Sequence, residues 1–242
     1  MKEQLYTIPV NEGFDEKGEC PFCNIYKTLE NDSINYMLGP SYMEDDIRAE
    51  TDKIGFCSKH LDMMHHEKNH LGLALMLHSH IKSINSHLPS LCNNIKSQKK
   101  KSILSKLQKT ESDLSPHLTN ITNSCYICNR INSHFDTYFN TFFYLWKKDK
   151  DIKEKVLNSD GFCLKHFLRL IVDAKAELSQ KDYDEFIDII LPLEMNNLKR
   201  LEEEIDHFIN KFDHNYKDAP WGNSKDALPR IILKLQSIFI KE

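Results

Sequence analysis

One cysteine and histidine pattern occurs twice in the chain, and this duplication constrains the fold more than any other feature. Each copy has a CxxC pair and then a GFCxKH segment, with 33 residues between the second and third cysteine in the first copy and 34 in the second. The CxxC pairs lie 105 residues apart and the GFCxKH segments 106. Flanking letters also agree, because Asp46-Ile47-Arg48 and Asp151-Ile152-Lys153 precede the two GFC segments. We infer a tandem duplication.

The repeated residues are the ligand types that structural zinc sites use. Zinc takes four thiolate or imidazole ligands in a tetrahedron, often as two separated pairs. In CxxC the two sulfurs converge around a turn or a helix start, and in CxxH at a helix start the ligands share one face. We predict two closed structural sites with two zinc ions per chain, held by eight residues: Cys20, Cys23, Cys57, His60, Cys125, Cys128, Cys163 and His166. We expect each CxxC pair to share its ion with the CxxH pair of its own copy.

Glycine and proline beside the ligands fit this interpretation. Gly55 and Gly161 precede the CxxH pairs and can adopt backbone conformations that other residues avoid. Pro21 fits the first turn of a helix, where its missing N–H costs little. Helix N-termini also favour the thiolate over the thiol.

The cysteines leave other interpretations open. A Cys3His set can hold an iron-sulfur cluster. One site could also act as a thiol-based redox or metal sensor that releases its ion on oxidation. Cys20-Pro21-Phe22-Cys23 resembles an oxidoreductase motif, although the βαβ pattern of thioredoxin-like proteins is absent. Cys92 stands apart from the other six cysteines, and we expect it to be a small core residue.

The hydrophobic pattern predicts an all-α fold. Strand signals are scarce, whereas apolar residues recur at spacings of three and four, as in the aromatic stripe Phe139, Phe142, Phe143 and Trp146. We expect duplicated helical units, each pinned by a Cys3His site, and a C-terminal helical extension. The predicted segments are the first repeat at 1–90, a lysine-rich connector at 91–118, the second repeat at 119–180 and C-terminal helices at 181–242 that pack on the repeats.

His66-Glu67-Lys68-Asn69-His70 matches HExxH, the zincin signature, and lies in a segment that we expect to be helical. In that signature two histidines bind zinc and the glutamate is the general base. The surroundings argue against a hydrolase, because Lys68 places a charge inside the motif and the second copy has nothing equivalent. We therefore predict no catalytic residues, and keep the zinc hydrolase as a less favoured alternative than the sensor.

Composition restricts the partners and the compartment. The 242 residues are 40% hydrophobic and 28% charged, which is ordinary for a globular protein. Because the formal net charge is −4, the chain has no general electrostatic attraction for nucleic acid or anionic lipid. No apolar run approaches the length of a membrane helix, and the first residues do not resemble a signal peptide. We expect a cytoplasmic protein, in which cysteines serve as ligands or reactive thiols rather than disulfides.

The motifs together resemble an uncharacterised bacterial family, frequent in anaerobic Gram-positive species, with tandem CPxC…GFCxKH units and a C-terminal PWG segment. The residues that carry the resemblance are Cys20-Pro21-Phe22-Cys23, Gly55-Phe56-Cys57, Leu71-Gly72-Leu73-Ala74-Leu75-Met76, Gly161-Phe162-Cys163, Pro220-Trp221-Gly222 and Asp226-Ala227. Cys125-Tyr126-Ile127-Cys128 departs from the pattern by lacking the proline. The family implies no activity. We expect a non-enzymatic adaptor or regulator that binds a protein partner.

Overall fold

The computed structural model describes residues 6–98, 120–216 and 218–240, and gives only the backbone for 90–98. Helices and short connections make up these residues, and no strand occurs among them, so the predicted all-α fold is confirmed. The side chain of Cys92 lies outside this description, as does most of the predicted connector at 91–118. Residues 91–98 continue a long helix.

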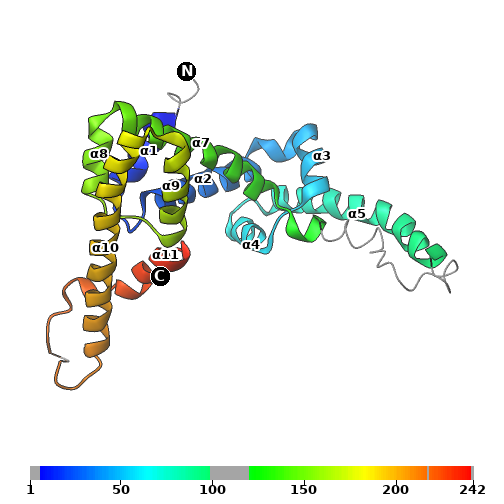
Figure 1. Ribbon diagram of the computed structural model, residues 1–242. Helices are drawn as coiled ribbons and strands as arrows, with labels where there is room; N and C mark the ends of the chain where they lie inside the picture. The colour runs from blue at the N-terminus through cyan, green and yellow to red at the C-terminus, as the bar shows by residue number, and fades with distance from the viewer. Residues whose placement is uncertain (1–5, 99–119, 217, 241–242) are drawn as a thin grey trace. The chain divides into compact units, whose positions relative to one another are not determined.

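Figure 1 shows the helices coloured in chain order. In chain order they are α1 (Thr7–Asp15), α2 (Pro21–Leu38), the 3₁₀ helix η2 (Pro40–Met43), α3 (Asp45–Ile54), α4 (Ser58–His66), α5 (His70–Gln98), α7 (Tyr126–Lys148), α8 (Lys150–Leu157), α9 (Leu164–Glu177), α10 (Gln180–Asn210), the 3₁₀ helix η3 (Gly222–Ser224) and α11 (Ala227–Gln236). No helix among the described residues is both long enough and apolar enough to cross a membrane.

The chain forms two compact units that cut across the sequence repeats. Unit 1 consists of Met1–Thr28 and His134–Glu242, and unit 2 of Leu29–Ser133. Their boundaries fall inside α2 and α7, so each of these helices begins in one unit and ends in the other. Each unit therefore combines parts of both sequence copies.

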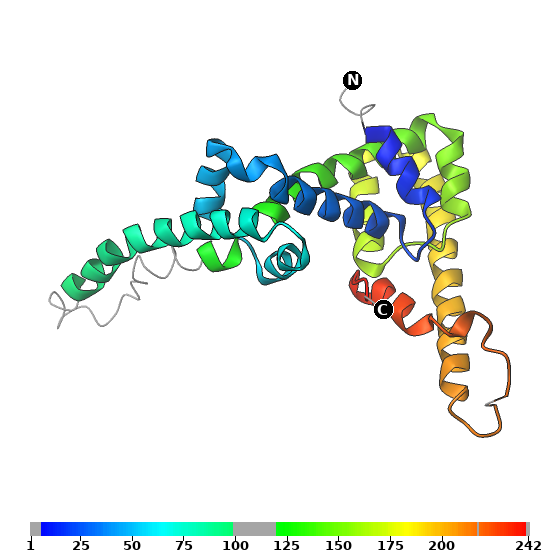
Figure 2. The ribbon, with the colours of Figure 1, turned by 180° about the vertical axis from the view of Figure 1, so that it is seen from behind.

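Aromatic side chains build the core of unit 1. The predicted stripe on α7 is buried, with Phe139, Phe142, Phe143 and Trp146 all 0–1% exposed. Phe22, in the first turn of α2, stacks on Phe139 with ring centroids 4.1 Å apart. Around this core α1 packs on α8, and α9, α10 and α11 pack on one another (Figure 2). The first turn of α2 is thus fixed against α7 by rings.

In unit 2, α3 lies along α5, and η2 and α4 also contact α5. Polar contacts fix the turns between these helices. Asn69 donates to the carbonyl of Leu38 at 2.7 Å, and the Arg48 guanidinium donates to the carbonyl of Leu75 at 3.2 Å. Asn69 lies in the connection that follows the short helix α4, whose N-cap and first turn carry one predicted ligand pair.

Candidate metal centres

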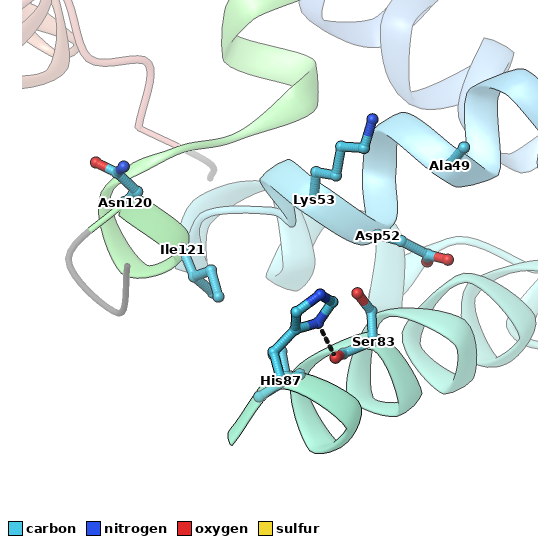
Figure 3. Close-up of a pocket in the computed structure, with 8 residues that line it drawn as sticks. Ala49, Asp52, Lys53, Ser83, His87, Asn120 and Ile121 are labelled. Atoms are coloured by element: carbon cyan, nitrogen blue, oxygen red, sulfur yellow. Dashed lines mark hydrogen bonds between the residues drawn. The ribbon is translucent and has the colours of Figure 1, made fainter. Parts of the chain in front are cut away.

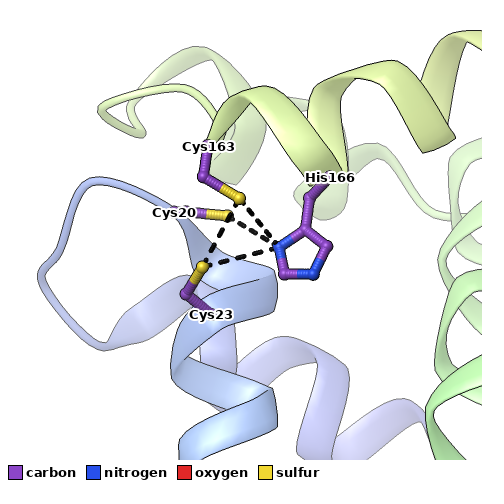
Figure 4. A group of neighbouring side chains, drawn as sticks. All are labelled: Cys20, Cys23, Cys163 and His166. Carbon is purple, nitrogen blue, oxygen red and sulfur yellow. Dashed lines mark hydrogen bonds between the residues drawn. The ribbon is translucent and has the colours of Figure 1, made fainter. Parts of the chain in front are cut away.

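Four side chains in unit 1 converge on one point, and we call them the first cluster (Figure 4). Cys20 and Cys23 lie just before and within the first turn of α2, and Cys163 and His166 occupy the same places on α9. The Nδ1 atom of His166 lies 3.4, 3.5 and 3.2 Å from the Sγ atoms of Cys20, Cys23 and Cys163. The sulfurs of Cys23 and Cys163 are 3.5 Å apart. All four residues are at most 2% exposed.

The second cluster lies within unit 2 and has the same design. Cys57 caps the N-terminus of α4 and His60 lies in its first turn, while Cys125 and Cys128 begin α7. The Nδ1 atom of His60 lies 3.2, 3.3 and 3.4 Å from the sulfurs of Cys57, Cys125 and Cys128. Cys57 and Cys128, whose sulfurs are 3.9 Å apart, are only half-buried, whereas Cys125 and His60 are buried.

These separations fit a single tetrahedral zinc ion in each cluster. With Zn–S near 2.3 Å and Zn–N near 2.0–2.1 Å, a tetrahedron places two sulfurs about 3.8 Å apart and a sulfur and a nitrogen about 3.5 Å apart. The observed sulfur–sulfur distances are 3.5 and 3.9 Å, and the sulfur–nitrogen distances are 3.2–3.5 Å. The donor atoms therefore surround a space of the size that one such ion fills.

The prediction that each CxxC pair shares its site with the CxxH pair of its own copy is wrong. Both clusters combine the CxxC of one copy with the CxxH of the other. The long helices explain this crossing, because the 18 residues of α2 carry the chain about 27 Å away from Cys20 before it turns toward Cys57. In α7 the residues that follow Cys128 likewise carry it about 30 Å away before it reaches Cys163.

Hydrogen bonds join the two ligand segments of each cluster at matching positions, but the donor is a hydroxyl in one cluster and an ammonium in the other. In unit 2 the Ser124 hydroxyl donates to the carbonyl of Ile54 at 2.6 Å. In unit 1 the ammonium of Lys234, from α11, donates to the carbonyls of Asp160 and Glu19 at 2.7 and 3.4 Å. Glu19 and Ser124 each precede a CxxC pair, and Asp160 and Ile54 each precede a GFC segment. In unit 1 a lysine of the C-terminal extension thus links the two ligand segments by hydrogen bonds, as a serine does in unit 2.

The predicted special backbone at the two glycines is confirmed. Gly55 has φ +70° and Gly161 has φ +75°. At Gly161 an added Cβ would lie 2.6 Å from a carboxylate oxygen of Glu194, and at Gly55 it would lie 2.8 Å from the ring of His80. That Glu194 oxygen accepts a hydrogen bond of 2.8 Å from the backbone N–H of Phe162. The absence of a side chain at Gly161 therefore leaves space for the buried carboxylate of Glu194, which holds Phe162 just before the Cys163–His166 pair.

The electrostatics of the clusters favour thiolates bound to a cation. Two helices point their N-termini at each cluster, and each terminus carries roughly half a positive charge. Three thiolates with one Zn²⁺ carry a net charge of about −1, which two such termini match. The helix starts thus provide both the ligands and the compensating field.

Without a bound cation, the three thiols of a cluster do not readily lose their protons together. Burial is the largest effect that raises the pKa of Cys20, and burial with the nearby Cys125 sulfur raises the pKa of Cys128 to about 12. Burial is the largest single effect on Cys125 and opposes its ionisation, but the hydrogen bond from His60 and those from the backbone of Cys128 and Cys57 together lower the pKa to about 6. Holding three thiolates together therefore calls for a cation, which is the role of zinc in such a donor set.

The two histidines have different neighbours, a difference that the sequence analysis missed. The Nε2 atom of His60 lies 3.0 Å from a carboxylate oxygen of Glu30, which also pairs with Lys59 at 2.5 Å. Burial opposes ionisation of Glu30, but these two partners lower its pKa below the usual range. His166 instead lies among aromatic rings, with that of Phe135 centred 5.3 Å away. Glu30 and Phe135 both stand seven residues after the second cysteine of their pair, so aligning the two copies could have revealed the difference.

The expectation that the HExxH residues share one helix is wrong. His66 is the last residue of α4, Glu67 is extended and His70 begins α5. His66 contacts the carbonyl of Asp62 at 2.8 Å, and His70 contacts that of His65 at 3.1 Å. Because α4 ends between the two histidines, they lack the i, i+4 geometry of a zincin. Neither joins a metal-binding group among the described residues.

Two open pockets lie apart from the clusters. One, in unit 2, has a volume of about 440 Å³ and is lined by Asp52, Ser83 and His87, among others (Figure 3). There the His87 ring contacts the backbone carbonyl of Ser83 at 2.8 Å rather than its hydroxyl. The other, in unit 1, has a volume of about 410 Å³ beside Trp221. Neither lining includes a residue of the metal clusters.

Comparison with known proteins adds a family but no activity. A family model described as "Family of unknown function (DUF6062)" matches residues 1–242. No curated protein and no solved structure matches the chain. The clusters themselves are therefore the evidence from which a function can be argued.

Proposed function

Because the chain belongs to this family of unknown function, we propose a function from the clusters: a zinc-binding helical protein with two structural sites that acts by binding a protein partner. The observation that carries the proposal is the donor set. Each cluster offers three sulfurs and one nitrogen, all from the chain, at separations that suit one tetrahedral ion. Such a site has no open position for a substrate, which favours a structural role.

Zinc is preferred to an iron-sulfur cluster for a geometric reason. In a cluster of several irons, ligands that bind different irons are held far apart, because irons and sulfides lie between them. In each site here all four donor atoms lie within 4.8 Å of one another, which leaves space for one ion. We expect other members of the family to share the CPxC, GFCxKH and PWG segments.

An adaptor or regulator is the favoured role because no catalytic constellation is found among the described residues. The chain has a formal net charge of −4, so a protein is a more suitable partner than nucleic acid. We expect it to work in the cytoplasm, where the six cysteines of the clusters stay reduced; none of the six forms a disulfide.

Metal content tests the proposal. The chain is purified without a histidine tag, and its metals are measured by elemental mass spectrometry beside an ultraviolet-visible spectrum. We expect two zinc ions per chain and no visible absorbance. Iron with sulfide and a brown colour would overturn the assignment, as would protein that carries no metal. As matched controls, Cys23→Ser and Cys125→Ser should each reduce the content from two zinc ions to one.

A further inference from the structure

The two clusters share a donor set but differ in their exposure to solvent. In the first cluster the three cysteines are 0–1% exposed. In the second, Cys57 and Cys128 are half-buried, whereas Cys125 is 3% exposed. Oxidants react with thiolates that they can reach, so solvent access separates two otherwise equal sets of sulfurs.

The surroundings of the two clusters increase this difference. Around the first cluster, aromatic rings pack on His166, and the hydroxyl of Ser237 lies 3.0 Å from the Cys163 sulfur. A hydrogen bond from that hydroxyl draws charge from the thiolate and makes it a weaker nucleophile. Around the second cluster, the corresponding place beside the histidine holds Glu30, paired with the solvent-exposed Lys59. The duplicated sites have thus acquired different environments.

Resting on the proposed function, we propose that the second cluster is a peroxide-sensitive zinc site in which Cys57 and Cys128 form a disulfide and release the ion. The first cluster keeps its zinc under the same conditions. These two sulfurs are 3.9 Å apart, so each must move only about 1 Å to reach the disulfide length near 2.05 Å. The site would report hydroperoxides while the first cluster preserves unit 1.

The chemistry balances with hydrogen peroxide as the oxidant. One thiolate attacks the peroxide, whose O–O bond breaks, and the sulfur becomes a sulfenic acid as the first water leaves after taking up a proton. The second thiolate then attacks that sulfur, the S–S bond forms, and the hydroxyl leaves with a proton as the second water. Two thiolates have lost two electrons and the peroxide has gained them. Only Cys125 and His60 would then remain as ligands, too few for the four that a closed zinc site uses.

The test begins with the intact chain carrying two zinc ions, as measured by elemental analysis. Dilute hydrogen peroxide is added with a chromophoric zinc chelator, and the thiols are then alkylated under denaturing conditions for peptide mass spectrometry. We expect release of one zinc equivalent and a disulfide that joins the peptides of Cys57 and Cys128. Release of both ions together, of neither ion, or from the first cluster would overturn the inference, as would a disulfide between other cysteines.

Paired variants show which cluster releases its ion. Cys20→Ser with Cys163→Ser disrupts the first cluster and leaves only the ion of the second, which dilute peroxide should release. Cys57→Ser with Cys128→Ser leaves only the ion of the first cluster, which should stay bound. The reverse pattern, or release from both variants, would contradict the proposal. Absence of zinc from the wild-type chain before peroxide is added would instead contradict the proposed function, so the two failures are distinguishable.

Discussion

At the scale of single residues, the glycine before each CxxH pair carries a strict requirement. Gly161→Ala should destabilise the protein, because φ +75° disfavours a side chain and the new Cβ would lie 2.6 Å from Glu194. The backbone alone costs about 1–3 kcal/mol, and the contact with Glu194 adds to this. Urea unfolding of the zinc-loaded protein measures the loss. Gly222→Ala is the matched control, since it has φ +54° and no atom within 4 Å of an added Cβ. Equal losses at both positions would remove the packing argument.

Glu30 offers a second residue-scale prediction, because its carboxylate orients the imidazole of His60. Loss of such a partner to a metal-bound histidine typically weakens metal binding by about 10–100-fold. We expect Glu30→Ala to weaken zinc binding at the second cluster by this factor, as measured by competition with a chromophoric chelator. Glu30→Gln should weaken zinc binding less than Glu30→Ala does, since the amide oxygen can still accept a hydrogen bond from the ring N–H of His60. Affinity at the first cluster should not change, and a loss there would show that Glu30 acts through the fold.

At the scale of elements, α11 matters because it places a buried ammonium behind the first cluster. Lys234 is 1% exposed, and its Nζ atom lies 3.3 Å from a carboxylate oxygen of Glu194, which is 2% exposed. Burial is the largest influence on Glu194 and raises its pKa above the usual value. Lys234→Met should therefore cost ~3–5 kcal/mol, because it leaves that carboxylate buried without its cation.

The double variant Lys234→Met with Glu194→Gln tests the cause of that loss. A neutral amide oxygen can still accept from the N–H of Phe162 but needs no cation. Thermal unfolding should show that the double variant recovers part of the stability lost in the single variant. If Glu194→Gln adds its own loss to that of Lys234→Met, the two residues act independently and the pair is not coupled.

The sequence predicted that helices begin at the ligands, but it did not predict which residues contact the ligand segments. The reason is physical. The N-termini of α2, α4 and α9 follow from nearby residues. The local signals are the spacing of cysteine and histidine, Pro21 and the glycines of the GFC segments. Lys234 and Glu194 are far from the ligands along the chain and carry no local signal. Only Glu30 had such a signal, since its counterpart in the other copy is Phe135.

At the scale of the whole molecule, the duplication itself hides which pairs meet. Each copy has one CxxC and one CxxH, so own-copy and crossed pairing satisfy the same spacing and the same ligand count. The lengths of α2 and α7 decide between them, and the sequence fixes those lengths less surely than it fixes the ligands. In the crossed arrangement each compact unit contains one complete cluster.

Paired substitutions distinguish crossed from own-copy pairing by counting zinc ions. Cys20→Ser with Cys163→Ser alters a single cluster in the crossed arrangement, so this variant should retain one zinc ion. Cys20→Ser with Cys57→Ser alters both clusters and should retain none. Own-copy pairing requires the opposite result, because Cys20 and Cys57 would then share one site. Both variants replace two thiols by hydroxyls, so elemental mass spectrometry compares proteins that differ only in which sites are incomplete. One zinc ion in the second variant and none in the first would therefore contradict the crossed fold itself.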